Sequence, residues 1–202
     1  MKTSQKIYLP FKRLIGIFGS FVGIIVCFAL LWWWVIPVNA IVTKGSPFFL
    51  QERYGKNKKV FKMIKFRSMK RDANPNLAPS DMDEATQASM DTGFGKFLRK
   101  TSLDELPQLV NILCGTLSVI GPRPITIREL MLHFTEEERA KLLTVKPGLT
   151  GNWAVHGRNK TEYKTHERQE LELEYVDKIS FKKDAEIFFR TFAAIFMFDE
   201  VK

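Results

Sequence analysis

The chain is organised around the stretch Thr101-Ser-Leu-Asp-Glu-Leu-Pro-Gln-Leu-Val-Asn-Ile-Leu-Cys-Gly-Thr-Leu-Ser-Val-Ile-Gly-Pro-Arg-Pro124. Two adjacent carboxylates, Asp104 and Glu105, stand at the start of an apolar run with the character of a helix. The run is followed by the rigid turn Gly121-Pro-Arg-Pro124, which carries an arginine. An acid pair that can act as a nucleophile or bind a metal, close to a fixed cation, is suited to phosphate chemistry.

A structural interpretation of the acid pair competes with the functional one. Ser102-Leu-Asp-Glu105 matches the capping-box pattern, in which Glu105 would satisfy backbone donors and Asp104 would be a first-turn acid favoured by the helix dipole. A helix beginning at Ser102 would, however, place Pro107 near its fifth position, where the ring is poorly tolerated. We therefore expect the pair at the mouth of a distorted or late-starting helix, and the residues alone leave both interpretations open.

Charge is distributed unevenly along the 202 residues, whose formal net charge is +9. No acidic residue precedes Glu52, and ten Lys or Arg lie between Lys44 and Arg71. This basic half predicts an anionic partner such as lipid headgroups, a phosphorylated substrate or nucleic acid. No nucleic-acid-binding motif accompanies it, so we expect no nucleic acid. Cys27 and Cys114 lie among apolar residues without metal-ligand spacing, which favours a reducing, cytosolic face.

Residues 14–43 contain no charged side chain, which predicts a membrane segment. As a helix they would extend ~45 Å, more than the ~30 Å of hydrocarbon in a bilayer. Positive charge flanks both ends, and the positive-inside rule then favours both ends in the cytoplasm. A re-entrant helix broken at Pro37, with Asn39 satisfying freed backbone groups, meets this condition. A single span with a tolerated proline is the alternative.

The remainder of the chain predicts a small α+β fold. Residues 46–54 and 60–69 read as two strands that pair as a hairpin across a basic turn at residues 56–59, and residues 71–91 read as a surface loop. Residues 128–143 have helical periodicity, but the capping box Thr135-x-x-Glu138 indicates two helices. The other expected elements are a helix from residue 93, a tight loop at 147–151, a charged helix at 162–176 and a Phe-rich amphipathic helix at 181–198.

Several polar residues outside the acid pair are candidates for binding. Arg123, held between two prolines, can grip a phosphate bidentately. Lys65 is another candidate, but it could equally be an ordinary exposed charge on a strand. Gly157-Arg158-Asn159 is a short sequence typical of a loop, and Arg158 is the candidate within it. The three histidines show no metal-ligand spacing and are interpreted as structural or surface residues.

These motifs together resemble the bacterial sugar transferases that act as monotopic phosphoglycosyl transferases on polyprenol phosphate. The resemblance covers nearly the whole chain in order, and its most specific parts are the Leu-Asp-Glu-Leu-Pro-Gln and Ile-Gly-Pro-Arg-Pro sequences. Its other parts are the basic N-terminus with its hydrophobic segment, Lys65-Phe-Arg-Ser-Met69, Arg99-Lys100, Lys146-Pro-Gly-Leu-Thr-Gly151 and Gly157-Arg-Asn159.

The resemblance implies a reaction and roles for individual residues. Asp104 would attack the β-phosphate of a UDP-sugar, release UMP and carry a sugar-phosphoryl group, which undecaprenyl phosphate then accepts. Glu105 would act in catalysis by holding Mg²⁺. The contacts to phosphate and nucleotide would be Lys65, Arg99, Arg123 and Arg158. The product would be the first lipid-linked intermediate in the assembly of an exopolysaccharide or another glycoconjugate.

The resemblance also completes the predicted architecture. It is an α+β, mostly helical fold with a short β-hairpin, amphipathic surface helices and an N-terminal re-entrant membrane helix broken at Pro37. Residues 1–45 would form the basic N-terminus and re-entrant helix, and residues 46–202 a cytosolic, membrane-associated catalytic domain. The location implied is the cytoplasmic face of a bacterial inner membrane, and the sequence assigns no oligomeric state.

Two departures from the family pattern affect individual residues. The family hairpin usually turns at Ser-Pro, whereas this chain has Ile36-Pro37, so no serine can bond back to the broken turn. The family commonly has Asp where Glu172 stands, which leaves the role of Glu172 open. A membrane-anchored scaffold without activity and a metal-dependent phosphatase or nucleotide hydrolase remain the rival interpretations.

Overall fold

The computed structural model describes residues 3–70, 90–156 and 165–196, which are mostly helical, as predicted. These residues form two compact units. The first unit comprises Met1–Ser20, Glu52–Phe61 and Asn111–Lys202, and the second comprises Phe21–Gln51 and Lys62–Val110. Each unit is therefore assembled from segments that are distant in sequence. The expected boundary at residue 45 between a membrane part and a catalytic domain stays a prediction.

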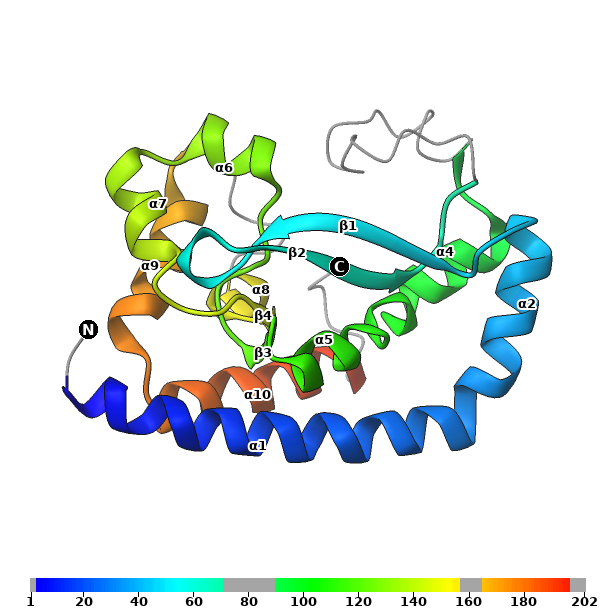
Figure 1. The fold of residues 1–202 in the computed structure, drawn as a ribbon, viewed down its shortest axis with the longest axis horizontal. Coiled ribbons are helices and arrows are strands. Elements are labelled where there is room, and N and C mark those ends of the chain that lie inside the picture. The colour runs from blue at the N-terminus through cyan, green and yellow to red at the C-terminus, as the bar shows by residue number, and fades with distance from the viewer. Residues whose placement is uncertain (1–2, 71–89, 157–164, 197–202) are drawn as a thin grey trace. The chain divides into compact units, whose positions relative to one another are not determined.

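The N-terminal helical region consists of α1 (Thr3–Cys27), the π-helical turn η1 (Phe28–Trp32) and α2 (Trp33–Thr43). Together they form one helix of 41 residues, Thr3–Thr43, that is long and apolar enough to cross a membrane. Pro37 lies inside α2, and the irregular turn lies upstream at η1, where Figure 1 shows the ribbon bending. A π-helical turn interrupts the regular hydrogen-bond ladder and is a recognised cause of kinks. The structure thus shows an irregular turn upstream of Pro37, while the break at Pro37 and the re-entrant topology stay predictions.

Asn39 has a different role from the predicted one. Its side chain is fully buried, and its Nδ2 donates a hydrogen bond of 2.8 Å to the carbonyl of Pro47. The carboxamide therefore fastens α2 to the chain that follows, instead of repairing a broken turn at Pro37. Lys44, which adopts the left-handed conformation (φ 51°), ends the helix directly before this connection.

The predicted hairpin is confirmed as β1 (Phe48–Tyr54) and β2 (Val60–Phe66), joined by the 3₁₀ turn η2 (Lys56–Lys58). Figure 1 shows the two strands as a twisted antiparallel pair. The hairpin contributes residues to both units. In the second unit, the buried residues Phe66, Leu98, Cys27, Trp32 and Val35 form the core, where the end of β2 packs with helices.

The first unit contains a second, smaller sheet that the sequence did not predict. β3 (Ser118–Ile120) pairs in parallel with β4 (Gly148–Thr150), with Ser118 opposite Gly148. The expected tight loop at residues 147–151 is therefore wrong, because most of it is a strand. Three residues on each side give no alternating pattern from which a strand could be recognised.

The first unit also contains several helices. They are α6 (Ile127–His133), α7 (Glu136–Leu142), α8 (Asn152–His156), α9 (Glu167–Lys178) and α10 (Phe181–Phe196). Of these, α10 contacts both strands of the small sheet. The capping box at Thr135 is present, so the predicted division of residues 128–143 into two helices is confirmed. Residues such as Ile120, Leu130, Tyr175 and Ile187 form the core of this unit. In α10, Phe181, Phe188, Phe189 and Phe192 are exposed while Ile187 is buried, which confirms an amphipathic surface helix.

Candidate active site

The two acids lie on a separate 3₁₀ turn, η4 (Leu103–Glu105), between α4 (Gly93–Lys100) and α5 (Gln108–Cys114). Ser102 adopts the left-handed conformation (φ 57°), and its side chain caps no backbone donor. The capping-box interpretation of Ser102 and Glu105 is therefore wrong. Helix α5 begins directly after Pro107. The fixed φ of proline is compatible with a helix start, and its missing N–H costs no hydrogen bond there because the first N–H groups of a helix have no partner within it. The acid pair thus precedes a late-starting helix, as the position of Pro107 predicted.

Glu105 pairs with a cation from the hairpin. Lys65 of β2 donates to Glu105 Oε1 across 2.9 Å, and both side chains are partly exposed. Since Lys65 is 40 residues away in sequence, the hairpin fold brings this cation to the acid pair.

Asp104 is the more deeply buried acid, with 8% of its surface exposed. Burial raises the pKa of its carboxyl to about 6; the charge of Glu105 acts in the same direction, whereas Lys65 and Arg99 oppose it. A carboxylate with this pKa is largely ionised at neutral pH and only weakly hydrated. Such a group is available as a nucleophile.

Arg99 reaches the same surroundings from the last turn of α4. It forms an ion pair with Asp91, and its charge acts on Asp104. Helix α4 is itself positioned by close backbone packing, because a Cβ on Gly95 would lie 2.6 Å from Ser68 Cα. The Thr92 side chain caps the start of α4 by accepting from Gly95 N–H at 2.8 Å.

Arg123 belongs to the first unit, where the Gly-Pro-Arg-Pro turn follows β3. Gly121 N–H donates to Thr150 O at 2.9 Å, and Gly148 N–H donates to Pro122 O at 2.8 Å. A Cβ on Gly148 would overlap the backbone of Gly121, so the two glycine- and proline-rich motifs pack backbone to backbone. This contact joins two motifs that lie 26 residues apart in the chain.

Glu172 of α9 binds the backbone of Arg123. The backbone N–H of Arg123 donates to Glu172 Oε2 at 3.0 Å, and Glu172 is 1% exposed. Burial raises the pKa of Glu172 to about 7, although the hydrogen bond from Arg123 and the charges of Arg168 and Arg123 oppose this. Glu172, whose role the sequence left open, thus has a structural role: it anchors the turn of residues 121–124, the arginine turn.

The guanidinium groups of Arg123 and Arg168 both lie against the ring of Trp153. Their Cζ atoms are 5.0 and 4.2 Å from the ring centroid, which is the geometry of a cation–π interaction. The Arg123 side chain is exposed at this place. It therefore presents a charged, positioned donor group that could bind an anion.

The structure brings together four of the predicted residues: Lys65, Arg99, Asp104 and Glu105. Arg123 belongs to the other unit, and Arg158 lies outside the described residues. Sequence reasoning missed Arg53, Trp153 and Arg168. Arg53 donates to Pro124 O at 3.1 Å and pairs with Glu129 at 3.2 Å, so it supports the far end of the arginine turn. The capping box at Thr126 and Glu129 was visible in the sequence and marks the helix start that Arg53 contacts, but no local signal indicates Arg53 itself.

The acid pair also offers a donor set compatible with magnesium. Mg²⁺ in nucleotide enzymes is bound by one or two carboxylates together with substrate phosphates. Glu105 shares one oxygen with Lys65 and lies beside a second carboxylate, Asp104. Across the described ranges, no three His, Cys, Asp or Glu side chains gather as a preformed cage. Asp104 and Glu105 are therefore compatible with a Mg²⁺ ion that takes most of its ligands from substrate phosphates.

Comparison with known proteins identifies the family. The family model of the bacterial sugar transferases matches residues 7–198. The chain belongs to the bacterial sugar transferase family. It is 33% identical to the galactosyl transferase CpsE of Streptococcus agalactiae over 98% of this chain and 44% of the relative.

Two further relatives of this family have names that specify a reaction. The undecaprenyl-phosphate galactose phosphotransferase of Salmonella typhimurium is 37% identical over 73% of this chain and 33% of its own length. The UDP-glucose:undecaprenyl-phosphate glucose-1-phosphate transferase of Escherichia coli is 39% identical over 73% of this chain and 32% of its own length. The chain therefore spans less than half the length of each of these three relatives.

Proposed function

We propose that this protein transfers a sugar-1-phosphate from a UDP-sugar to undecaprenyl phosphate. The observation that carries the proposal is the buried carboxyl of Asp104, with a pKa of about 6, beside Glu105 and its partner Lys65. Membership of the bacterial sugar transferase family and the names of the relatives support the same reaction class.

In the first step, a carboxylate oxygen of Asp104 attacks the β-phosphorus of the UDP-sugar. The bond between this phosphorus and the oxygen bridging to the α-phosphate breaks, and UMP leaves with the electron pair. The sugar-phosphoryl group then remains on Asp104 as an acyl phosphate. Lys65 and Arg99, whose charges already act on Asp104, would balance the negative charge of the diphosphate.

In the second step, a phosphate oxygen of undecaprenyl phosphate attacks the phosphorus held by Asp104. The acyl phosphate bond breaks, the Asp104 carboxylate is regenerated and a polyprenol diphosphate sugar leaves. Two successive displacements at one carboxylate give ping-pong kinetics.

Glu105 would hold Mg²⁺, which supplies charge neutralisation of the diphosphate when bound. Arg123 and Arg158 are the proposed further contacts to phosphate or nucleotide. The anchored backbone of Arg123 supports this role, because an arginine fixed at its main chain loses less freedom on binding.

The apolar helix Thr3–Thr43 would hold the protein in a bacterial inner membrane as a re-entrant segment with the catalytic residues on the cytoplasmic side. Its composition and the lipid substrates named for the relatives support membrane association. The exposed phenylalanines of α10 suit the membrane surface.

The test uses the purified full chain with Mg²⁺ and a panel of UDP-sugars, with and without undecaprenyl phosphate. We expect continuous UMP release and a glycolipid product that both require the lipid and Asp104, whereas without the lipid UMP release should stop at one equivalent per protein. Without the lipid, intact-protein mass should rise by one sugar phosphate, and Asp104→Asn should abolish this increase. Asp177→Asn, which changes an exposed carboxylate, is the matched control and should retain activity.

Three outcomes would contradict the proposal. Continuous UMP release without undecaprenyl phosphate would indicate a hydrolase. Absence of product with every sugar of the panel, in a folded sample, would favour a scaffold. Full activity of Asp104→Asn would exclude the aspartyl intermediate.

A further inference from the structure

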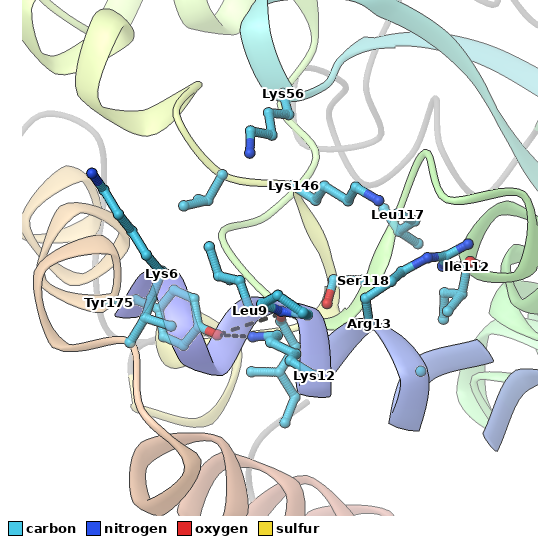
Figure 2. Close-up of a pocket in the computed structure, with 15 residues that line it drawn as sticks. Lys6, Leu9, Lys12, Arg13, Lys56, Ile112, Leu117, Ser118, Lys146 and Tyr175 are labelled. Carbon is cyan, nitrogen blue, oxygen red and sulfur yellow. Dashed lines mark hydrogen bonds between the residues drawn. The ribbon is translucent and has the colours of Figure 1, made fainter. Parts of the chain in front are cut away.

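The first unit contains a cavity of about 480 Å³ that none of the candidate active-site residues lines. Figure 2 shows this basic pocket, which we define by its five cationic lining residues: Lys6, Lys12, Arg13, Lys56 and Lys146. None of the described lining residues is acidic, and most of the others are apolar, including Leu9, Leu117 and Ile179. A basic, apolar-walled pocket suits an anion that carries hydrocarbon.

Two of the five cations are already used by the protein. Lys12 pairs with Asp184 at 2.7 Å and hydrogen-bonds the hydroxyl of Tyr175. Arg13 donates to the backbone carbonyls of Ile112 and Leu113, the second at 2.8 Å, and so caps the C-terminal end of α5. In Figure 2 the amine of Lys6 lies apart from the other charges.

Lys56 and Lys146 remain as cations for a ligand. Neither forms an ion pair with a carboxylate in the part of the chain that the structure describes. A Cβ on Gly115 would lie 2.9 Å from Arg13 Nη2 and 3.4 Å from Lys146 Nζ, so these two positive groups converge at one point. Burial, followed by repulsion from Arg13 and Lys56, lowers the pKa of Lys146. An anion bound beside the amine of Lys146 would relieve its repulsion from Arg13 and Lys56.

Helix α1 indicates what kind of anion this is. Lys6, Leu9, Arg13 and Gly16 follow one another at helical spacing along the face that lines the basic pocket. The opposite face exposes large apolar side chains, between 59% and 72% of whose surface is accessible: Ile7, Phe11, Leu14, Ile15 and Phe18. Helix α1 therefore lines the basic pocket with one face and presents an apolar surface that suits a bilayer on the other, so a phosphate in the pocket lies across one helix from hydrocarbon.

We propose that the basic pocket binds the phosphate headgroup of an anionic membrane phospholipid through Lys56 and Lys146, with the acyl chains extending along α1. This site is separate in its residues from the proposed transfer reaction, and its occupation is measured as binding and not as turnover. An experiment that contradicts one of the two proposals therefore does not contradict the other.

The test titrates the full chain, purified in an uncharged detergent, with dioleoyl phosphatidylglycerol or dioleoyl phosphatidylcholine, and counts bound lipid by native mass spectrometry. We expect saturable binding of one phosphatidylglycerol. Lys56→Gln/Lys146→Gln should weaken it at least about tenfold, since two charged contacts are lost. Lys56→Arg/Lys146→Arg should retain binding. Lys58→Gln/Lys59→Gln, which removes the same charge from exposed residues next to Lys56 that do not line the pocket, is the matched control and should bind like the unmodified protein.

Other arms identify the source of the phosphate. Displacement of phosphatidylglycerol by inorganic phosphate at equal concentration would overturn the lipid assignment, because the chains would then contribute nothing. Displacement by a much lower concentration of undecaprenyl phosphate would also overturn it and assign the pocket to the substrate lipid. Equal binding of phosphatidylcholine, or unchanged binding by Lys56→Gln/Lys146→Gln, would contradict the role of the two lysines.

Discussion

Glu172 illustrates how one buried carboxyl links the arginine turn to the stability of the fold. Its pKa is raised from 4.5 to about 7, so the folded protein holds a proton that the unfolded chain releases between these values. The free energy of unfolding therefore decreases as the pH rises through this window, by at most about 3 kcal/mol. Above pH 7 the folded state must contain a buried anion, which Arg123 N–H partly stabilises.

We predict that Glu172→Gln removes this pH dependence. The glutamine carbonyl can still accept from Arg123 N–H, but it takes up no charge, so the variant should be more stable than the unmodified protein at pH 8 and similar at pH 5. Unfolding in detergent at both pH values measures this difference. Glu170→Gln, on the exposed side of the same helix, is the control. An unchanged pH dependence in Glu172→Gln would show that another group binds the proton.

The residues of the acid pair could be located from sequence, but their surroundings could not. Asp104 and Glu105 are adjacent and precede Pro107, so a displaced helix start was predictable from local rules. The contact of Glu105 with Lys65 depends on the hairpin, and that of Glu172 with Arg123 joins residues 49 apart. No local pattern encodes such pairs, because tertiary packing alone decides them.

At the level of elements, most local signals were reliable, although the capping-box pattern at Ser102 was not. The capping box at Thr135 correctly divided residues 128–143, and the basic turn correctly joined the two strands of the hairpin. The parallel pair β3–β4 was missed because its partners are 30 residues apart and each strand is only three residues long. The irregular turn at η1 was not predicted, because the sequence Phe28–Trp32 contains no helix breaker and Pro37 was the visible signal.

Helix α4 provides a test of packing at the scale of an element. We predict that Gly95→Ala destabilises the protein by about 1–3 kcal/mol, because the new Cβ would lie 2.6 Å from Ser68 Cα and the backbone must shift. The shift would also displace Arg99, so the proposed transfer activity should fall. Thermal unfolding and UMP release measure the two effects.

Gly93 is the matched control for this prediction. It lies in the same helix, and nothing is within 4 Å of a Cβ built on it. Gly93→Ala should therefore be neutral or stabilise by up to about 1 kcal/mol through helix propensity. Equal effects of the two substitutions would mean that α4 does not depend on close contact with residue 68.

At the scale of the molecule, the two ends of the chain are joined inside the first unit. Gln5 Nε2 donates to the carbonyls of Val176 and Asp177 at 3.1 and 3.0 Å. Tyr8 donates to Asp184 at 2.7 Å, and Lys12 forms its ion pair with the same carboxylate. The start of α1 is therefore held by α9 and α10, more than 160 residues later. Charge and hydropathy along the sequence do not reveal such long-range contacts, because they describe each segment by itself.

We predict that Asp184→Asn destabilises the protein by about 3–5 kcal/mol, because it leaves the buried ammonium of Lys12 without a counter-charge. The side chains of this pair are 12% and 7% exposed. Asp177→Asn breaks the pair of Lys141 and Asp177, whose side chains are 41% and 58% exposed, and should cost less than about 1 kcal/mol. Denaturant unfolding of both variants in detergent measures the difference. If Asp184→Asn cost no more than Asp177→Asn, water or another anion would have to reach Lys12, and the ends of the chain would be joined less firmly than these contacts require.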